Sequence, residues 1–162
     1  MESKHPLPLP PLPLPGIIVP RVGGVTMIEL LIVILVLGIL TAIAVPSYQE
    51  HVARSNRAEA KGILLETAQF LERNYTVANR YDLDGAGNAT VLPFATSPKP
   101  GGGAAKYNIT AAYGAAPAQT FTLTATRTGS MATDACGDLT VDQTGARGLA
   151  NNSLTVAECW GR

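Results

Sequence analysis

Residues 25–45 read VTMIELLIVILVLGILTAIAV, with Gly23 and Gly24 in front and Pro46 behind. The stretch carries a single charge, Glu29. At 1.5 Å of rise per residue it would form a helix about 31 Å long, which matches the hydrocarbon thickness of a bilayer. The sequence therefore predicts a helix over 25–45 that can span a membrane.

The position of Glu29 in the first third of this stretch needs a physical reason. A carboxylate inside a spanning helix costs about 2.5–3.5 kcal/mol on insertion scales. The positive end of the helix dipole and the nearness of the interface reduce that cost. Either these local effects suffice, or Glu29 has a cationic partner elsewhere.

Residues 24–29, Gly-Val-Thr-Met-Ile-Glu, followed by an unbroken apolar run, resemble the class III signal of type IV prepilins. The usual form of that signal is a glycine, the cleavage point, a phenylalanine, and then Thr-Leu-Ile-Glu. Here Val25 replaces the phenylalanine and Met27 the leucine, while Gly24 and Glu29 keep their register. Both exchanges are apolar for apolar.

The resemblance implies a processing step and a partner for the charge. A prepilin peptidase would cut between Gly24 and Val25 and methylate the new amine of Val25, which stays cationic. When subunits pack helix to helix, this amine would meet the Glu29 carboxylate of a neighbour. One ion pair then replaces two desolvated charges. Glu29 is therefore predicted to set the register of assembly.

Residues 1–24 are rich in Leu-Pro alternation, which excludes a helix and indicates a polyproline II-like segment. The apolar run follows the glycine instead of preceding it, so this is not an ordinary secretory signal. By the resemblance, 1–24 is a prepilin leader that is removed. Most such leaders are short and basic, whereas this one is long and carries only Lys4 and Arg21 as Lys or Arg. A genuine extension and a misplaced start codon both remain open.

Two residues should weaken the helix locally. Gly38 costs about 1 kcal/mol relative to alanine, and Pro46 removes one backbone hydrogen bond and should kink the helix. In type IV pilins a glycine and a proline bracket the part of the helix that bends or melts on entry into the filament, and Gly38 and Pro46 match them. The alternative is simply a kinked membrane helix.

Beyond Pro46 the periodicity predicts an amphipathic helix over 46–75. Its apolar residues recur at helical spacing and need a sheet to cover them. The stripe comprises Tyr48, Val52, Ile63, Leu64, Ala68, Phe70, Leu71 and Tyr75.

Residues 76–103 are dominated by turn signals and are predicted to be a connecting loop. The part from Asp82 to Asn88 faintly resembles a calcium loop, but Pro93 stands where an EF-hand has its bidentate glutamate, so no metal site is predicted. Residues 104–162 should form an antiparallel sheet, with strands over 106–112, 120–128 and 139–141 and a short fourth strand over 153–157. The fold class is therefore α+β, a long N-terminal helix packed on a C-terminal sheet.

The two cysteines, Cys136 and Cys159, form an even count in a small exported domain, which suggests one disulfide. Two buried free thiols are the alternative. Residues 134–145 also resemble the D-x-C-G-x-L-x-x-x-x-x-G pattern of the E-type minor pilins. That second resemblance implies the type IV pilin fold for nearly all of 24–160.

The sequence contains no recognisable pattern of catalytic residues. The only histidines, His5 and His51, have no plausible nucleophile beside them, and no phosphate loop, zinc spacing or dinucleotide fingerprint occurs. We therefore predict neither an enzyme nor a cofactor. Without residues 1–24 the chain has ten basic and eleven acidic residues, a net charge of about −1, which gives no electrostatic reason to expect nucleic acid binding.

The resemblances together predict a minor type IV pilin that is stored in the inner membrane as a single-pass protein and polymerises into an extracellular pilus. The implied partners are other pilin subunits, prepilin peptidase, the inner-membrane assembly platform and the lipid bilayer. Such filaments serve motility, adhesion or DNA uptake. One alternative is a pseudopilin of type II secretion. Another is a competence pilin that binds DNA, for which Arg127, Arg147 and Arg162 are scattered along the sequence.

Overall fold

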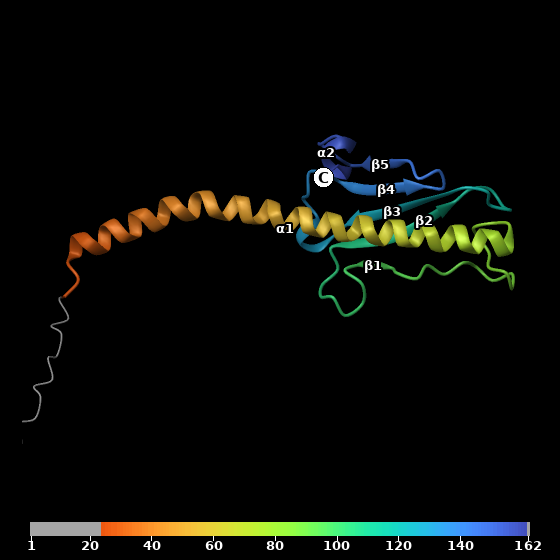
Figure 1. Cartoon of the computed structure of the whole chain (residues 1–162), viewed down its shortest axis with the longest axis horizontal. Coiled ribbons are helices and arrows are strands. Elements are labelled where there is room, and N and C mark those ends of the chain that lie inside the picture. The colour runs from red at the N-terminus through yellow and green to blue at the C-terminus, as the bar shows by residue number, and fades with distance from the viewer. Residues whose placement is uncertain (1–23, 162) are drawn as a thin grey trace, which may run out of the picture. The chain divides into compact units, whose positions relative to one another are not determined.

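The computed structural model describes residues 24–161, so residues 1–23 of the leader predicted over 1–24 lie outside the described residues. The chain divides into two compact units, Met1–Thr41 and Ala42–Arg162. The helix α1, Met27–Ala78, contributes to both. The sheet and a short C-terminal helix belong to the second unit (Figure 1).

In the first unit the apolar side chains of α1 are exposed along its whole length. Met27 is 83% exposed, Leu31 60% and Ile39 57%. Within residues 24–161, α1 is the one helix that is long and apolar enough to cross a membrane. Its most apolar 18 consecutive residues have a mean hydropathy of 3.0, and none of them is buried. The length and composition predicted from the sequence are therefore present as helix.

In the second unit α1 ends at Ala78, three residues later than the expected Tyr75. Asn79 follows with φ of 54°, and its N–H donates to the carbonyl of Tyr75 at 2.8 Å. An asparagine in the left-handed conformation directly after a helix is a common C-terminal cap. The turn signal at Asn79 therefore marks the end of the helix itself, and residues 76–78 do not belong to the loop.

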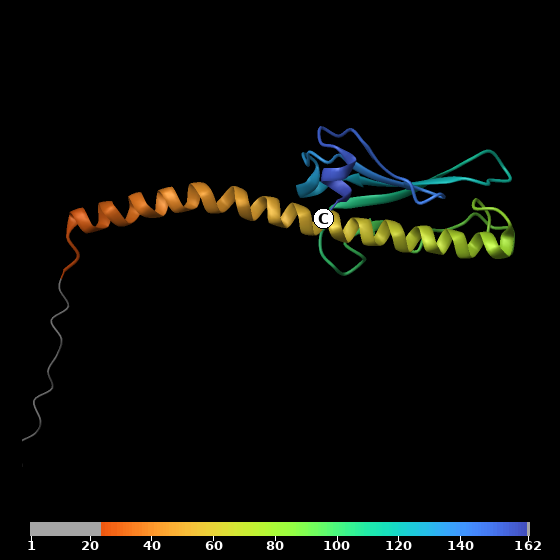
Figure 2. The same cartoon turned by 45° about the horizontal axis from the view of Figure 1, so that its top comes forward.

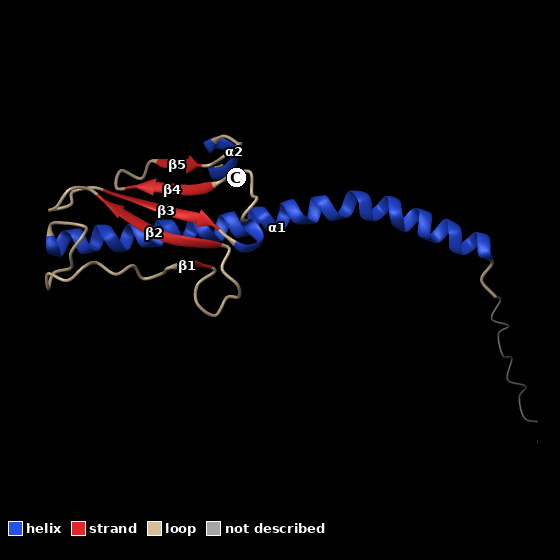
Figure 3. Ribbon diagram, turned by 180° about the vertical axis from the view of Figure 1, so that it is seen from behind, coloured by secondary structure: helices blue, strands red, loops and turns tan. Residues whose placement is uncertain are grey.

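The sheet has five strands in the order β1-β2-β3-β4-β5, and every neighbouring pair is antiparallel (Figure 3). The strands expected over 106–112 and 120–128 are present within one residue, and the one over 139–141 is longer. The observed strands are β1 Thr96–Ser97, β2 Tyr107–Tyr113, β3 Phe121–Arg127, β4 Asp138–Asp142 and β5 Arg147–Ala150. The first of them, β1, lies inside the segment expected to be a loop.

The strand expected over 153–157 is wrong. The strand that follows β4 is β5, which lies earlier in the sequence than expected, and Val156–Trp160 forms the short helix α2. Thr155 and Glu158 make a capping box, in which Thr155 accepts from the Glu158 N–H and the Glu158 carboxylate accepts from the Thr155 N–H. Reciprocal capping of this kind stabilises a helix start and overrides the strand preference of the local residues.

Replacing Thr155 by alanine should lower the free energy of unfolding by about 1 kcal/mol, because one capping oxygen is lost. Urea unfolding followed by circular dichroism measures the change. Thr133→Ala removes an exposed threonine that caps no helix and should leave stability within about 0.5 kcal/mol. Equal effects of both variants would contradict a capping role for Thr155.

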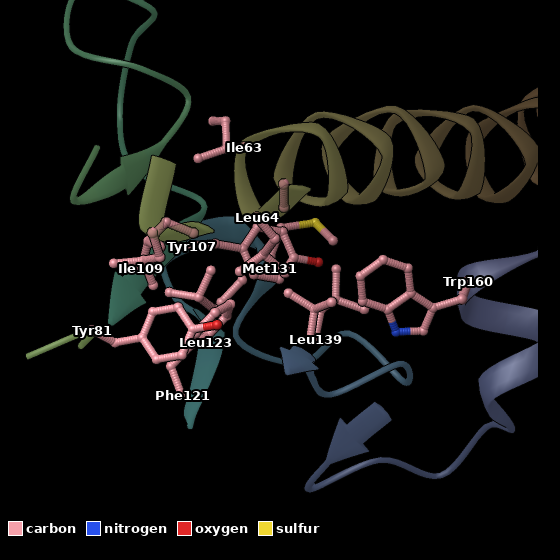
Figure 4. Packing of buried hydrophobic residues seen from close by; sticks show 14 residues of the cluster. Ile63, Leu64, Tyr81, Tyr107, Ile109, Phe121, Leu123, Met131, Leu139 and Trp160 are labelled. Carbon is pink, nitrogen blue, oxygen red and sulfur yellow. The ribbon is translucent and has the colours of Figure 1, made fainter. Parts of the chain in front are cut away.

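The core of the second unit lies between α1 and one face of the sheet. Residues Ala60, Leu64 and Leu71 of α1 are fully buried, as their helical spacing requires. Alternate residues of the strands meet them, namely Tyr107, Ile109, Phe121, Leu123, Ala125, Leu139 and Val141. Figure 2 shows α1 running along one side of the sheet, and Figure 4 shows the packed side chains. The predicted α+β packing of helix on sheet is confirmed.

Candidate functional site

The start of α1 is built by Thr26 and Glu29. The Glu29 N–H donates to Thr26 Oγ1 at 3.2 Å, and the Thr26 N–H donates to Glu29 Oε2 at 3.4 Å. This is a second capping box, and the sequence signature that could have predicted it is Thr-x-x-Glu over residues 26–29. In an isolated chain the Glu29 carboxylate thus satisfies one backbone donor, the Thr26 N–H, at the start of its own helix.

Gly24 and Val25 lie just ahead of that capped start. Both are exposed and outside any helix, with Val25 67% exposed. A bond between two such residues is accessible to a peptidase. The role of the pair in cleavage and methylation stays a prediction of the sequence.

Gly38 and Pro46 both lie inside α1, which is assigned as continuous helix through them. Apart from its chain neighbours and the nearby backbone of its own helix, no described atom lies within 4 Å of the place where a Cβ on Gly38 would stand. Thr41 Oγ1 donates to the carbonyls of Leu37 and Gly38 at 2.9 and 3.0 Å. Pro46 lacks the N–H that would complete its own turn. The bending or melting of α1 at these positions stays a prediction.

In the second unit, a buried ion pair ties α1 to the segment before β4. The Arg57 guanidinium donates twice to Asp134, from Nε at 3.1 Å and from Nη2 at 2.9 Å, and its Nη2 also reaches Glu50 at 3.3 Å. The side chains of Arg57 and Asp134 are only 8% and 6% exposed. Burial alone would lower the pKa of Arg57, but the hydrogen bonds and charges of Asp134 and Glu50 outweigh it and raise that pKa.

Other polar groups surround this pair. Burial raises the pKa of the Tyr107 hydroxyl, and the negative charge of Asp134 raises it further. Arg127 donates to the carbonyl of Asp134, and its N–H donates to Asp138 at 3.0 Å. The pairing of Arg57 with Asp134 was not predicted from the sequence, because 77 residues separate the two and no local pattern links them.

Cys136 and Cys159 form a disulfide, and both residues are buried. The bond joins the segment before β4 to α2. The neighbouring Trp160 donates its indole N–H to the carbonyl of Gly148 at 2.9 Å, which ties α2 to β5 as well. The pairing expected from the cysteine count is present.

The segment that faintly resembles a calcium loop is a turn held by its own carboxylates. Asp82 accepts from Arg80 and from the Ala118 N–H, and Asp84 accepts from the N–H groups of Ala86 and Asn88. The Arg80 guanidinium lowers the pKa of Asp82 well below its usual range, with the Ala118 N–H adding to the effect. No group of three or more metal-ligating side chains occurs in residues 24–161.

Parts of the chain match known proteins. Residues 46–140 match the family described as "Type IV minor pilin ComP, DNA uptake sequence receptor", and residues 20–45 match the prokaryotic N-terminal methylation motif. The fimbrial protein EcpC of Eikenella corrodens is 62% identical over 37 residues, covering 23% of this chain and 24% of EcpC. The type IV major fimbrial protein FimA of Dichelobacter nodosus is 43% identical over 53 residues, covering 30% of this chain and 33% of FimA.

A further relative is the type IV major pilin protein PilA of Myxococcus xanthus, 52% identical over 52 residues that cover 31% of this chain and 24% of PilA. The matched segments thus span about a quarter to a third of the length of these relatives. A solved type IV pilin from Shewanella oneidensis aligns with 64% of this chain and 98% of its own at 24% identity and a TM-score of 0.43.

Two independent family matches adjoin each other. The methylation motif ends at Val45, and the minor-pilin family match begins at Pro46. The second alone covers more than half of the chain. The α+β fold, the exposed apolar helix and the disulfide near the C-terminus agree with both. The chain belongs to the family of type IV minor pilins described as ComP, DNA uptake sequence receptor.

Proposed function

We propose that this type IV pilin subunit is cut between Gly24 and Val25, methylated on the new amine of Val25, and polymerised through residues 25–45. The observation that carries the proposal is the apolar surface of α1, which is exposed from Met27 to Val45 with Glu29 as its single charge. A helical surface of this kind needs lipid or other helices to cover it. The methylation motif over residues 20–45 supports the processing step.

The partners follow from that surface. Before assembly the bilayer covers it, with the chain as a single-pass protein of the inner membrane, and after assembly the helices of neighbouring pilins cover it. Prepilin peptidase and an inner-membrane assembly platform act in between. The chemistry in this scheme belongs to the peptidase, and the pilin itself is a structural subunit.

Glu29 has two successive partners in this scheme. In the membrane its carboxylate serves the Thr26 capping box at the helix start. In the filament the methylated amine of a neighbouring Val25 approaches it and forms a charge-assisted pair in a dry environment. The capping box thus keeps the carboxylate hydrogen-bonded until the neighbour arrives.

A second function, binding of duplex DNA by the assembled filament, is favoured by the description of the family as a DNA uptake sequence receptor. The relatives named above are fimbrial and pilin proteins, which favours a pilus over a secretion pseudopilus. Motility and adhesion remain roles that the filament would share with its other subunits.

Mass spectrometry of filaments sheared from the cell surface tests the proposal. Because Arg54 is the first Lys or Arg after Gly24, trypsin should release residues 25–54 with a methylated N-terminus. A low yield of this peptide relative to other pilins is the result expected for a minor subunit. The processed chain in the membrane fraction alone would favour the pseudopilin, and an uncut chain beside an active peptidase would refute the proposal.

A further inference from the structure

Two cations from different elements stand over the ring of Trp160 in α2. The ammonium of Lys61 on α1 stands 5.9 Å from the centre of the indole ring, and the guanidinium carbon of Arg147 on β5 stands 5.4 Å from it. The indole is largely buried and forms one end of the core cluster (Figure 4). We call Lys61, Arg147 and Trp160 the Trp160 corner.

The charges of this corner are unbalanced. Of the nine Lys and Arg residues between 24 and 161, Arg54, Arg57, Arg80, Lys99 and Arg127 lie within 4.0 Å of an Asp or Glu oxygen. The other four in that range have no such partner, and two of the four meet at Trp160. Positive charge is therefore concentrated at one place in a unit whose described residues carry nine basic and ten acidic groups.

The environment of Lys61 is consistent with an excess of positive charge at the Trp160 corner. Burial lowers its pKa, and the positive charges of Arg57 and Arg147 lower it further. Its ammonium makes one long hydrogen bond, to the carbonyl of Gly161 at 3.4 Å. A partly buried cation with other positive charges nearby is stabilised by an anion brought in from outside.

A groove between α1 and α2 leads to Lys61. On the α1 side it is lined by His51, Arg54 and Lys61, which share one helix face and span about 15 Å. The two carboxylates in the lining are already used, because Glu50 accepts from Arg54 and Arg57, and Glu158 caps α2. Among the cations that line this groove, Lys61 is the one with no described carboxylate oxygen within 4.0 Å, so it is the cation that the groove presents to an incoming anion.

We propose that the Trp160 corner binds a phosphodiester group of duplex DNA. This inference rests on the DNA-binding part of the proposed function and names the surface that would carry it. The Arg147 guanidinium supplies a fork of N–H donors for phosphate oxygens, and Lys61 supplies a point charge beside it. The indole under both side chains limits their freedom, so less entropy is lost when a phosphate arrives.

The phosphate of a membrane lipid fits this position less well. Lys61 follows Val45, the end of the apolar stretch, by 16 residues, which is about 24 Å of helix. The headgroup layer on each side of a bilayer is only about 5–8 Å thick. The distance places Lys61 beyond the headgroups, so the DNA backbone is the source of phosphate that we infer.

The sole tryptophan of the chain is Trp160, so its fluorescence reports on this corner alone. The experiment titrates the full chain, in micelles of an uncharged detergent, with duplex DNA over a range of salt concentrations. The variant Lys61→Gln/Arg147→Gln removes both cations of the corner. The control Arg73→Gln/Lys106→Gln removes the same charge at two other cations without an acidic partner, neither of which stands over the indole.

We expect DNA to change the Trp160 emission and the corner variant to bind at least about tenfold more weakly, with the salt slope reduced by about 0.9 for the one lost phosphate contact. The control should lose much less. Unchanged thermal unfolding of both variants checks that they are folded.

Other outcomes separate the two proposals. If DNA binds the wild-type chain and the corner variant equally, the corner is refuted while DNA binding stands. If the corner and control variants lose equal affinity, net charge alone explains binding and the corner is again refuted. If DNA fails to bind while phosphatidylglycerol vesicles change the emission through Lys61, both DNA proposals fail and a membrane takes their place. A further titration uses inorganic phosphate. If phosphate changes the Trp160 emission and DNA does not, the corner is a site for free phosphate and the DNA proposal is refuted.

Discussion

Replacing Glu29 by glutamine is expected to lower the amount of this chain in surface filaments by at least about tenfold, because the methylated amine of a neighbouring Val25 then enters a dry interface without a counter-charge. Glutamine keeps a side-chain oxygen that accepts from the Thr26 N–H, so the capped helix start should survive. Quantitative mass spectrometry of sheared filaments against whole cells measures the change. Cleavage after Gly24 should continue.

Two matched variants identify the cause. Glu59→Gln removes a carboxylate from an exposed position of α1 outside the apolar stretch and should leave incorporation unchanged. Thr26→Ala removes the capping hydroxyl and keeps the charge of Glu29, so it should act more mildly than Glu29→Gln. Normal incorporation of the Glu29→Gln chain would show that the carboxylate serves only the capping box.

Replacing Arg57 by methionine is expected to lower the free energy of unfolding by about 3–5 kcal/mol, because Asp134 then remains buried without its cation. Urea unfolding of the chain in uncharged micelles, followed by the emission of Trp160, measures the change. The partner variant Asp134→Leu should be comparably harmful, since it leaves the guanidinium of Arg57 buried with only Glu50.

The control for this ion pair is Arg54→Met. Arg54 also pairs with Glu50, but its side chain is 67% exposed, and exposed pairs contribute at most about 1 kcal/mol. The double variant Arg57→Met/Asp134→Leu should be less damaging than either single change, because no unpaired charge is left inside. If Arg57→Met costs no more than Arg54→Met, the pair does not hold α1 to the sheet.

Much of the fold could be predicted from local patterns. The apolar run predicted the helix, and alternation in Tyr107–Tyr113 and Phe121–Arg127 predicted two strands, because period and burial are linked in both kinds of element. The prediction of a strand over 153–157 was wrong because the capping box made by Thr155 and Glu158 starts a helix there. The two-residue strand β1 has no sequence pattern of its own and exists through its pairing with β2.

Some residues of the candidate site could likewise be predicted from the sequence, and others could not. Gly24, Val25 and Glu29 follow each other closely, so a linear motif was enough to propose them. The pairing of Arg57 with Asp134 and the meeting of Lys61, Arg147 and Trp160 depend on tertiary structure. Spacing along the chain carries no information about such contacts, which is why scattered arginines in the sequence gave no reason to expect a cationic corner.

The order of the strands has a consequence for how the chain folds. Each strand pairs only with the strands next to it in the sequence, so the sheet can grow one hairpin at a time before the C-terminal part of the chain is in place. Cys159 comes after β5, so the disulfide can close only once the residues of every strand are available. Oxidation therefore joins the segment before β4 to α2 beside a sheet whose strand pairing needs no distant part of the chain.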